Sequence, residues 1–301
     1  MHDFLTYLQY ELYRSDHTVE AYRRDLQQFI DFHTSQTHLP FEAAPVTTAD
    51  IRRWIAALAS EGTGAASLRR KTQSLRAYFK FLCRRKELKC NPAADITLAK
   101  LPKPLPDFVR DPDMEALLDS IDPSAGIEAA RDHLILHLLY ATGLRRSELL
   151  QLTDASINPG LGSLRVVGKG RKERVVPLAT ELLDEIARFQ TMRDDRWPHL
   201  QPPRPLIATS HGAMSAANIE VIIKRLLKNE NAGRKSPHTL RHTFATSMLN
   251  GGAELNSVRA ILGHSSLATT QIYTHLQTTD LRRIYSSAHP RGLTNPDSES
   301  D

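Results

Sequence analysis

The chain has 301 residues, a formal net charge of +5, 41% hydrophobic residues and 24% charged residues. This length suffices for two domains with cores of their own, and no apolar run is long enough to cross a bilayer, so we expect no membrane insertion. The two cysteines, Cys83 and Cys90, occur without a signal peptide, which excludes a disulfide-stapled secreted domain and indicates reduced thiols in a cytoplasmic protein.

The first hundred residues show the periodicity of amphipathic helices. Apolar residues at helical spacing predict helices over residues 3–14 and 18–33, a third one beginning near Thr48, and a longer one after Gly64. We therefore predict a small all-helical domain over residues 1–98.

The last of these helices carries a run of basic residues. Between residues 69 and 89 it has nine lysines and arginines against one acidic residue, Glu87. A strip of one sign favours contact with a phosphate backbone, and an ordinary solvated helix face is the alternative interpretation. Our hypothesis is that this domain binds DNA, and the candidate contacts are Arg69, Arg70, Arg76 and Lys80.

A stretch rich in proline and lysine separates this domain from a second one. Residues 99–109 cannot continue a helix and indicate an extended linker. A helix near Asp111 then opens a domain over residues 110–288, and the apolar helix over 127–141 is predicted to be its buried centre. We predict a polar tail over residues 289–301.

A β-hairpin interrupts the helical pattern of the second domain. Apolar residues over 163–178, broken by a glycine-flanked Lys169, predict two strands with that lysine in the connecting loop. Further helices are predicted over 180–195 and 216–228, with a short strand at 206–208. The expected fold class is mainly α with a small β-hairpin or sheet, in two domains.

One helix of the second domain begins with several polar residues. Ser236 and Pro237 are typical of an N-cap and a first helical position. His238 and Arg241 are three residues apart and share a face, whereas the apolar residues of the helix lie on another face and predict its burial. His238 and His242 have the spacing of a metal-binding pair, but the glutamate that zinc proteases place between such histidines is absent.

Two more polar residues follow near helix ends. A short helix stops at Gly263, a residue typical of a left-handed helix end, and His264 comes directly after it. Tyr273 follows on a third helical piece. Taken singly, His264 fits a satisfied helix-end histidine and Tyr273 a half-buried packing residue, just as Arg145 fits a surface arginine and Lys169 a turn lysine.

Together these residues meet the needs of cutting a phosphodiester without a metal ion. The reaction needs guanidinium groups on the phosphate, a nucleophile that stays attached, a base for that nucleophile and an acid for the leaving sugar. The second domain holds a candidate for each role: Arg145 and Arg241 on the phosphate, Tyr273 as nucleophile, His238 as base, His264 as hydrogen-bond donor and Lys169 as acid.

Five motifs of the second domain resemble those of tyrosine recombinases, the phage-integrase family, in the same order and spacing. They are Ala141-Thr-Gly-Leu-Arg-Arg-Ser-Glu-Leu149, Gly168-Lys-Gly-Arg-Lys-Glu-Arg174, Pro237-His-Thr-Leu-Arg-His-Thr-Phe-Ala-Thr246, Leu262-Gly-His264 and Thr269-Thr-Gln-Ile-Tyr-Thr-His275. The N-terminal helices resemble the core-binding domain of the family, so the resemblance covers nearly the whole chain. Within the family the chain is most similar to the XerC/XerD group of chromosome-dimer resolvases.

The resemblance implies a complete active site and a mechanism. It assigns the six catalytic positions to Arg145, Lys169, His238, Arg241, His264 and Tyr273, with Glu148 as a supporting residue. It implies a clamp around DNA, a 3′-phosphotyrosyl intermediate, strand exchange through a Holliday junction, and no metal or nucleotide cofactor.

The resemblance also implies partners. These are a double-stranded DNA recombination site, a second tyrosine recombinase in a XerC/XerD-type heterotetramer that resolves chromosome dimers at cell division, and a septal DNA translocase. The amphipathic segment 279–287 is expected to dock on a neighbouring protomer, and docking on its own domain is the alternative.

Other functions share part of this pattern. An integrase of a phage or mobile element is the alternative within the family, although many integrases carry an additional N-terminal arm-binding domain. A type IB topoisomerase has the same chemistry but acts as a monomer. A DNA-binding regulator with an inactive site would tolerate the loss of Tyr273 or Lys169, and both are present.

Overall fold

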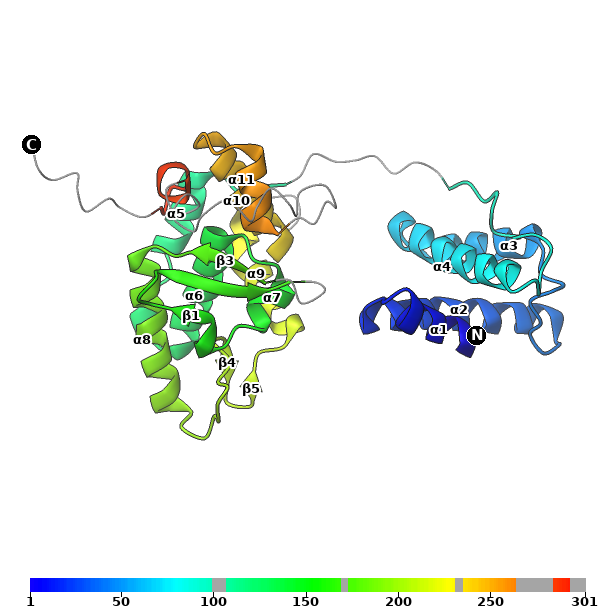
Figure 1. The fold of residues 1–301 in the computed structure, drawn as a ribbon, viewed down its shortest axis with the longest axis horizontal. Helices are drawn as coiled ribbons and strands as arrows, with labels where there is room; N and C mark the ends of the chain where they lie inside the picture. Colours follow the sequence, from blue (N-terminus) through cyan, green and yellow to red (C-terminus); the bar gives the residue numbers. More distant parts are fainter. Residues whose placement is uncertain (99–106, 169–172, 231–234, 264–283, 293–301) are drawn as a thin grey trace, which may run out of the picture. The chain divides into compact units, whose positions relative to one another are not determined.

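The computed structural model of the chain describes residues 1–98, 107–168, 173–230, 235–263 and 284–292. The chain divides into two compact units, an N-terminal unit over Met1–Pro104 and a C-terminal unit over Leu105–Asp301 (Figure 1). Cys83 and Cys90 are free thiols. Among the described residues, no helix combines the length and the apolar character needed to span a bilayer.

The N-terminal unit is entirely helical over its described residues. Its elements are α1 (His2–Thr6), a π-helical turn (Tyr7–Glu11), α2 (Asp16–Thr37), α3 (Thr48–Ser60) and α4 (Ala65–Arg84). The helices predicted from the apolar spacing are therefore present. Their core is aromatic, because the buried rings of Phe29 and Trp54 meet edge to face with centroids 5.3 Å apart and Phe79 packs beside them.

The basic helix α4 ends earlier than its charge pattern suggests. Its last residue is Arg84, and the backbone N–H of Glu87 donates to the carbonyl of Leu82 at 3.0 Å across a left-handed Lys86 with φ 61°. This closure ends a helix even though no glycine is present. Lys86, Glu87 and Lys89 consequently lie beyond the helix rather than on it.

The C-terminal unit is built around α6. Its principal helices are α5 (Asp111–Asp119), α6 (Ile127–Thr142), α7 (Arg146–Leu150), α8 (Thr180–Arg196), α9 (Ala216–Leu226), α10 (Pro237–Asn250) and α11 (Leu255–Leu262), with short 3₁₀ turns at Pro123–Ala125, Asp154–Ser156 and Leu227–Asn229. Residues 134–142 of α6 are buried without interruption, and α6 packs on both α8 and α10. The predicted central buried helix is confirmed.

The strands form two small antiparallel sheets. β1 (Ile157–Asn158), β2 (Ser163–Val167) and β3 (Glu173–Pro177) lie in the order β1-β2-β3, and β4 (Ala208–Thr209) pairs with β5 (Gly212–Ala213). The predicted hairpin is β2 and β3, and the mainly α fold class is confirmed. Of the strand predicted at 206–208, only Ala208 is in β4. Lys169, between β2 and β3, lies outside the described residues.

The chain after residue 283 packs into the core of its own unit. Residues 284–288 are helical, and the Tyr285 side chain is fully buried. A Cβ atom on Gly251 would lie only 1.9 Å from the carbonyl oxygen of Ala288, so the end of α10 and this segment are in backbone contact. Within the single chain, residues 284–288 thus pack on their own unit, as in the alternative given above. Residues 279–283 lie outside the described ranges, and docking of the segment on a neighbouring protomer stays a prediction.

The polar tail begins later than predicted. His289 is 4% exposed and stacks on Tyr285, with ring centroids 5.2 Å apart. Nε of Arg291 donates to Glu115 on α5 at 2.6 Å. Residues 289–292 are thus part of the folded unit, because the histidine ring fills the core and the arginine finds a carboxylate on a distant helix.

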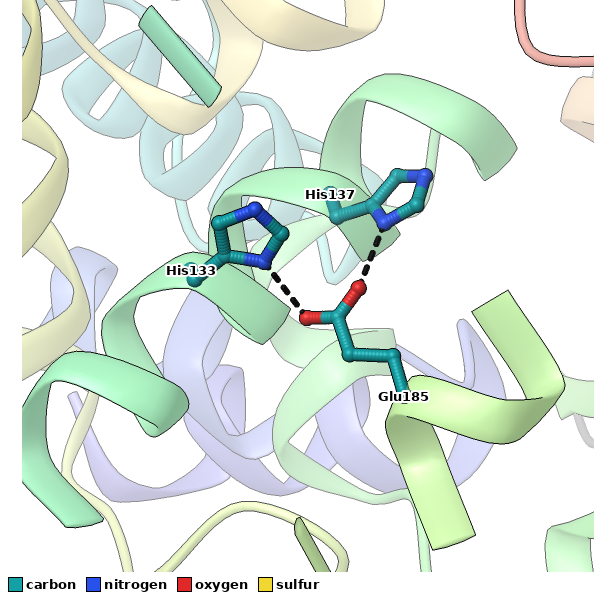
Figure 2. A group of neighbouring side chains, drawn as sticks. All are labelled: His133, His137 and Glu185. Carbon is teal, nitrogen blue, oxygen red and sulfur yellow. Dashed lines mark hydrogen bonds and ion pairs between the residues drawn. The ribbon is translucent and has the colours of Figure 1, made fainter. Parts of the chain in front are cut away.

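A buried carboxylate joins α8 to α6. Glu185 of α8 accepts hydrogen bonds from Nδ1 of His133 at 2.7 Å and from Nδ1 of His137 at 2.6 Å (Figure 2). Burial by itself raises the pKa of Glu185, but the hydrogen bonds from the two histidines outweigh it and lower the pKa to about 2. Glu185 therefore carries a negative charge near pH 7 where it joins the two histidines.

Candidate active site

The position of Arg145 follows from the way α6 ends. Gly143 adopts the left-handed conformation with φ 60°, directly after the last helical residue, Thr142. A Cβ atom at this position would lie 2.5 Å from Phe244 and 2.7 Å from Leu262, so only glycine fits the turn. The chain then reverses into α7, and Arg145 becomes the residue that precedes the first turn of that helix.

Glu148 is the centre of the site. Its carboxylate is buried in the first turn of α7 and accepts from the backbone N–H of Arg145 at 2.8 Å and from Nη1 of Arg145 at 2.7 Å. Arg174 of β3 donates to both carboxylate oxygens at 2.9 and 2.8 Å. Burial alone raises the pKa of Glu148, but the bonds from Arg174 and Arg145 outweigh it and bring the pKa to about 2.

Arg241 is held between two helix ends. It is 7% exposed, and its guanidinium donates to the carbonyl of Gly143 at the end of α6 and to that of Leu262 at the end of α11, both at 2.6 Å. A cation is favoured at the carboxyl ends of helices, where carbonyl groups lack helical partners. Nη1 of Arg241 also lies 4.0 Å from Glu148, so these contacts bring α10 to the same carboxylate.

The site carries excess positive charge. We call Arg145, Arg174 and Arg241 the arginine cluster; three positive charges against the one negative charge of Glu148 leave a formal charge of +2. Burial and the neighbouring Arg145 lower the pKa of Arg241 to about 10, so it remains protonated at neutral pH. Such a cluster is suited to an anion with several oxygens, because each guanidinium can donate two parallel hydrogen bonds.

His238 lies beside the arginine cluster at the start of α10. Partial burial foremost, and then the neighbouring His242 and Arg241, lower the pKa of His238 from the usual value of 6.5. The imidazole is consequently neutral near pH 7 and can accept a proton. Of the six catalytic residues expected from the sequence, the described residues bring Arg145, His238 and Arg241 to one place; Lys169, His264 and Tyr273 lie outside them.

Arg174 is a site residue to which the sequence analysis assigned no role. Besides holding Glu148, its Nε donates to the carbonyl of Ile261 at 2.7 Å, and its Cδ would lie 3.1 Å from a Cβ on Gly263. It thus joins the hairpin, α7 and the end of α11. A signal was present in the strand pattern: Arg174 lies opposite the buried Val166 and so on the inward face of the sheet, where an arginine requires a buried acidic partner.

The basic helix of the N-terminal unit uses some of its charges within the protein. Arg70 forms an ion pair with the buried Asp25. Arg76 donates to the carbonyls of Ala93 at 3.2 Å and Ile96 at 2.9 Å, which ties the segment after α4 to the helix. Lys80 and Arg69 are exposed on α4. DNA contact by these four basic residues stays a prediction, and the structure adds a second role for Arg70 and Arg76.

The two roles can be separated by substitutions on the same helix. We expect Lys80→Ala to weaken binding to every DNA sequence and to reduce the slope of log affinity against log salt by about 0.9, with unchanged stability. Arg76→Ala, as the matched variant, should also lower the free energy of unfolding by about 1–2 kcal/mol, because two carbonyls lose their donor. Filter binding across salt concentrations and urea unfolding measure both; an unchanged salt slope for Lys80→Ala would identify an ordinary solvated face.

Comparison with known proteins places the chain among recombinases. Residues 107–280 match the phage integrase family, and residues 1–86 match the phage integrase N-terminal SAM-like domain. The chain is 34% identical to tyrosine recombinase XerC of Chlorobaculum tepidum, over 96% of this chain and 94% of that protein. It is also 34% identical to tyrosine recombinase XerD of Staphylococcus epidermidis, over 96% of this chain and 98% of that protein.

Solved structures share the fold. One is the XerH site-specific recombinase bound to its difH substrate, with a TM-score of 0.67 and 22% identity over 87% of this chain and 78% of that chain. Another is the Tn1549 transposon integrase in complex with a circular intermediate DNA, with a TM-score of 0.68 and 19% identity over 93% of this chain and 96% of that chain. At these identities the likeness concerns the fold.

Proposed function

The chain belongs to the phage integrase family, the tyrosine recombinases that cleave and rejoin DNA, and we propose that it resolves chromosome dimers together with a second recombinase of the family. The observation that carries the proposal is the arginine cluster around Glu148, whose formal charge of +2 suits a DNA phosphate. Near-complete coverage of both XerC and XerD relatives supports the dimer-resolving role over that of an integrase.

In the first part of the cleavage step, arginines bind the phosphate. Arg145 and Arg241 bind the nonbridging oxygens of the scissile phosphate, and His264 donates a further hydrogen bond. The phenol of Tyr273 attacks phosphorus while neutral His238 accepts its proton, directly or through the phosphate. The new bond is a 3′-phosphotyrosyl ester, which conserves the energy of the broken P–O bond for rejoining.

The departing strand must then be protonated. The bond to the 5′ oxygen breaks, and Lys169, which follows β2 in the chain and precedes β3, supplies the proton that turns the alkoxide into a hydroxyl. The 5′ hydroxyl of a partner duplex attacks the phosphotyrosine in the reverse sense and regenerates Tyr273. Each step breaks one phosphate ester bond and forms another, so the cycle needs no nucleotide cofactor as an energy source.

The partners follow from the reaction. Two duplexes that exchange strands through a Holliday junction require four protomers, and XerC and XerD relatives at equal identity favour a heterotetramer of two recombinases. A septal DNA translocase would bring the two sites together at division. We propose a cytoplasmic location, because the substrate is the chromosome.

Mapping covalent protein–DNA junctions tests this function. Labelled genomic fragments are incubated with the protein, alone and with a second family member from the same cell, and denatured complexes are sequenced. A dimer-resolving enzyme should give covalent junctions at one chromosomal site. A chromosome dimer then carries two copies of that site in the same orientation, and recombination between them yields two monomers. Junctions confined to the ends of a mobile element would instead identify an integrase, and relaxation without strand exchange would identify a topoisomerase.

The acid role of Lys169 is open to a chemical test. We expect Lys169→Ala to slow cleavage of ordinary DNA by about 10²–10⁴-fold and to have little effect on a substrate with sulfur at the bridging 5′ position. A thiolate leaves without protonation, so the acid becomes redundant. Single-turnover cleavage of the two substrates measures the ratio; equal losses on both would mean that Lys169 only binds DNA.

A further inference from the structure

Three side chains between α6 and α8 form a compact set of metal-binding groups. His133 and His137 lie one turn apart on α6, and Glu185 reaches between their rings from α8, with one carboxylate oxygen directed to each (Figure 2). One ring nitrogen of each histidine and one carboxylate oxygen of Glu185 all lie within 4.8 Å of one another. The side chains are 14%, 4% and 9% exposed, in that order.

This set is separate from the active site. His137 lies roughly two helical turns before the Gly143 turn that positions Arg145. The hydrogen bonds described above for Arg145, Arg174 and Arg241 go to Glu148 and to backbone carbonyls rather than to this set. The cleavage and rejoining steps proposed above use no metal ion. A function for the set must therefore be sought elsewhere than in DNA cleavage.

The types of donor atom select the kind of ligand. Two imidazole nitrogens and one carboxylate oxygen are a set that zinc binds in many proteins, whereas magnesium and calcium prefer oxygen alone. We propose that His133, His137 and Glu185 bind one divalent first-row transition ion, with Zn²⁺ the best match. The partly exposed edge of His133 leaves room for water as the fourth ligand.

Binding requires small movements and a change of tautomer. Bonds of about 2.0–2.1 Å in a tetrahedron place neighbouring donor atoms about 3.3 Å apart. His133 lies 2.7 Å from one carboxylate oxygen of Glu185 and His137 lies 2.6 Å from the other, so the carboxylate must turn one oxygen towards the ion and the side chains must separate by roughly 0.6 Å. Each imidazole must also release the Nδ1 proton that it donates to Glu185 or carry it on Nε2 instead. Rotation of three side chains on two rigid helices can achieve this.

The consequence of binding is structural. An ion shared by α6 and α8 would replace two hydrogen bonds by three coordinate bonds across the centre of the C-terminal unit. Because the ion binds the folded chain, its presence stabilises that unit by mass action. The alternative is that the three side chains are only a hydrogen-bonded bridge, in which case Zn²⁺ leaves the unfolding temperature unchanged.

Metal titration of the full-length protein distinguishes the two. After removal of metal with a chelator, Zn²⁺ binding is measured in competition with a chromophoric chelator, and Co²⁺ is added separately as a spectroscopic probe. We expect one tight site, a tetrahedral Co²⁺ absorption spectrum and a higher unfolding temperature with Zn²⁺. Absence of tight Zn²⁺ binding, or an octahedral Co²⁺ spectrum alone, would overturn the proposal.

Variants assign the site. His133→Ala removes the least buried ligand, and Glu185→Gln removes the charge but keeps the side-chain shape. Loss of a residue that only supports a metal ligand weakens metal binding by about 10–100-fold, so loss of a ligand itself should weaken Zn²⁺ binding by more than that. His211→Ala, at an exposed histidine on the surface, is the control and should leave the tight site intact. Unchanged affinity in both His133→Ala and Glu185→Gln would place the ion elsewhere and overturn the assignment.

Discussion

We expect Tyr273→Phe to abolish covalent attachment of the protein to DNA while leaving its affinity for the same DNA near that of the unchanged chain. The substitution removes one oxygen atom, the nucleophile, and leaves the arginine cluster and the basic helix in place. Attachment is measured on a denaturing gel with a nicked substrate. Cleavage of this substrate releases a short DNA fragment that diffuses away, so the covalent complex accumulates. The covalent band should fall below detection, and binding in a gel-shift titration should change less than about twofold.

Tyr285 supplies the matched control. Its side chain is fully buried, burial raises the pKa of its phenol far above the usual value, and its hydroxyl donates to the carbonyl of Arg291 at 3.4 Å. A phenol in this position can neither reach a phosphate nor lose its proton easily. Tyr285→Phe should therefore retain attachment, and a result in which Tyr273→Phe stays active and Tyr285→Phe does not would contradict the assignment.

The second large effect is expected at Glu148. Glu148→Gln removes the negative charge that Arg145, Arg174 and Arg241 share, and the side chains of Arg174 and Arg241 are mostly buried. Breaking a buried ion pair from one side costs about 3–5 kcal/mol, because the remaining charges stay uncompensated. We expect the free energy of unfolding at pH 7 to fall by about that amount and cleavage to fall with it, since Arg145 and Arg174 lose their common anchor.

Acid titration provides an independent reading of the same group. The pKa of Glu148 is about 2 in the folded chain, against the ordinary value of 4.5 that applies when the chain is unfolded. The stabilising contribution of Glu148 is therefore complete above pH 4.5 and is lost as the pH falls towards 2. The difference corresponds to about 3 kcal/mol. The stability of the unchanged protein and that of Glu148→Gln should therefore converge across this window.

An exposed glutamate gives the control for this pair of measurements. Glu220 forms a surface ion pair with Arg146, the neighbour of Arg145, and its side chain is 57% exposed. Glu220→Gln should change the free energy of unfolding by less than about 1 kcal/mol. Urea unfolding at a series of pH values measures all three proteins. Parallel curves for the unchanged protein and Glu148→Gln would show that Glu148 does not carry the proposed charge interaction.

Much of the architecture was predictable from the sequence because the signals are local. Apolar periodicity identified the helices of both units, the continuous apolar run identified α6 as the central one, and Gly263 marked a helix end. The motifs around Arg145 and His238 were legible for the same reason, since each of these residues lies at the start of a helix. Local patterns therefore predicted the elements and the candidate residues, and the resemblance of the motifs indicated the family.

Tertiary structure decided which charged side chains face one another. Arg174 and Glu148 are 26 residues apart, and Arg76 finds its carbonyls 17 and 20 residues away. A charge pattern reports how many cations a helix carries, but not which of them are already engaged. For that reason the sequence predicts the same DNA-binding role for all the basic residues of the helix, whereas in the fold Arg70 and Arg76 have partners within the protein and Lys80 is exposed.

The same limit applies to the two features that the sequence left out. The pair His133 and His137 is visible on α6, but Glu185 lies 48 residues beyond His137 and joins it only because α8 packs on α6. Likewise, nothing local in residues 284–292 indicates that Tyr285 and His289 fill the core of their own unit. Burial and partnership depend on contacts between distant segments, and these exist only once the chain has folded.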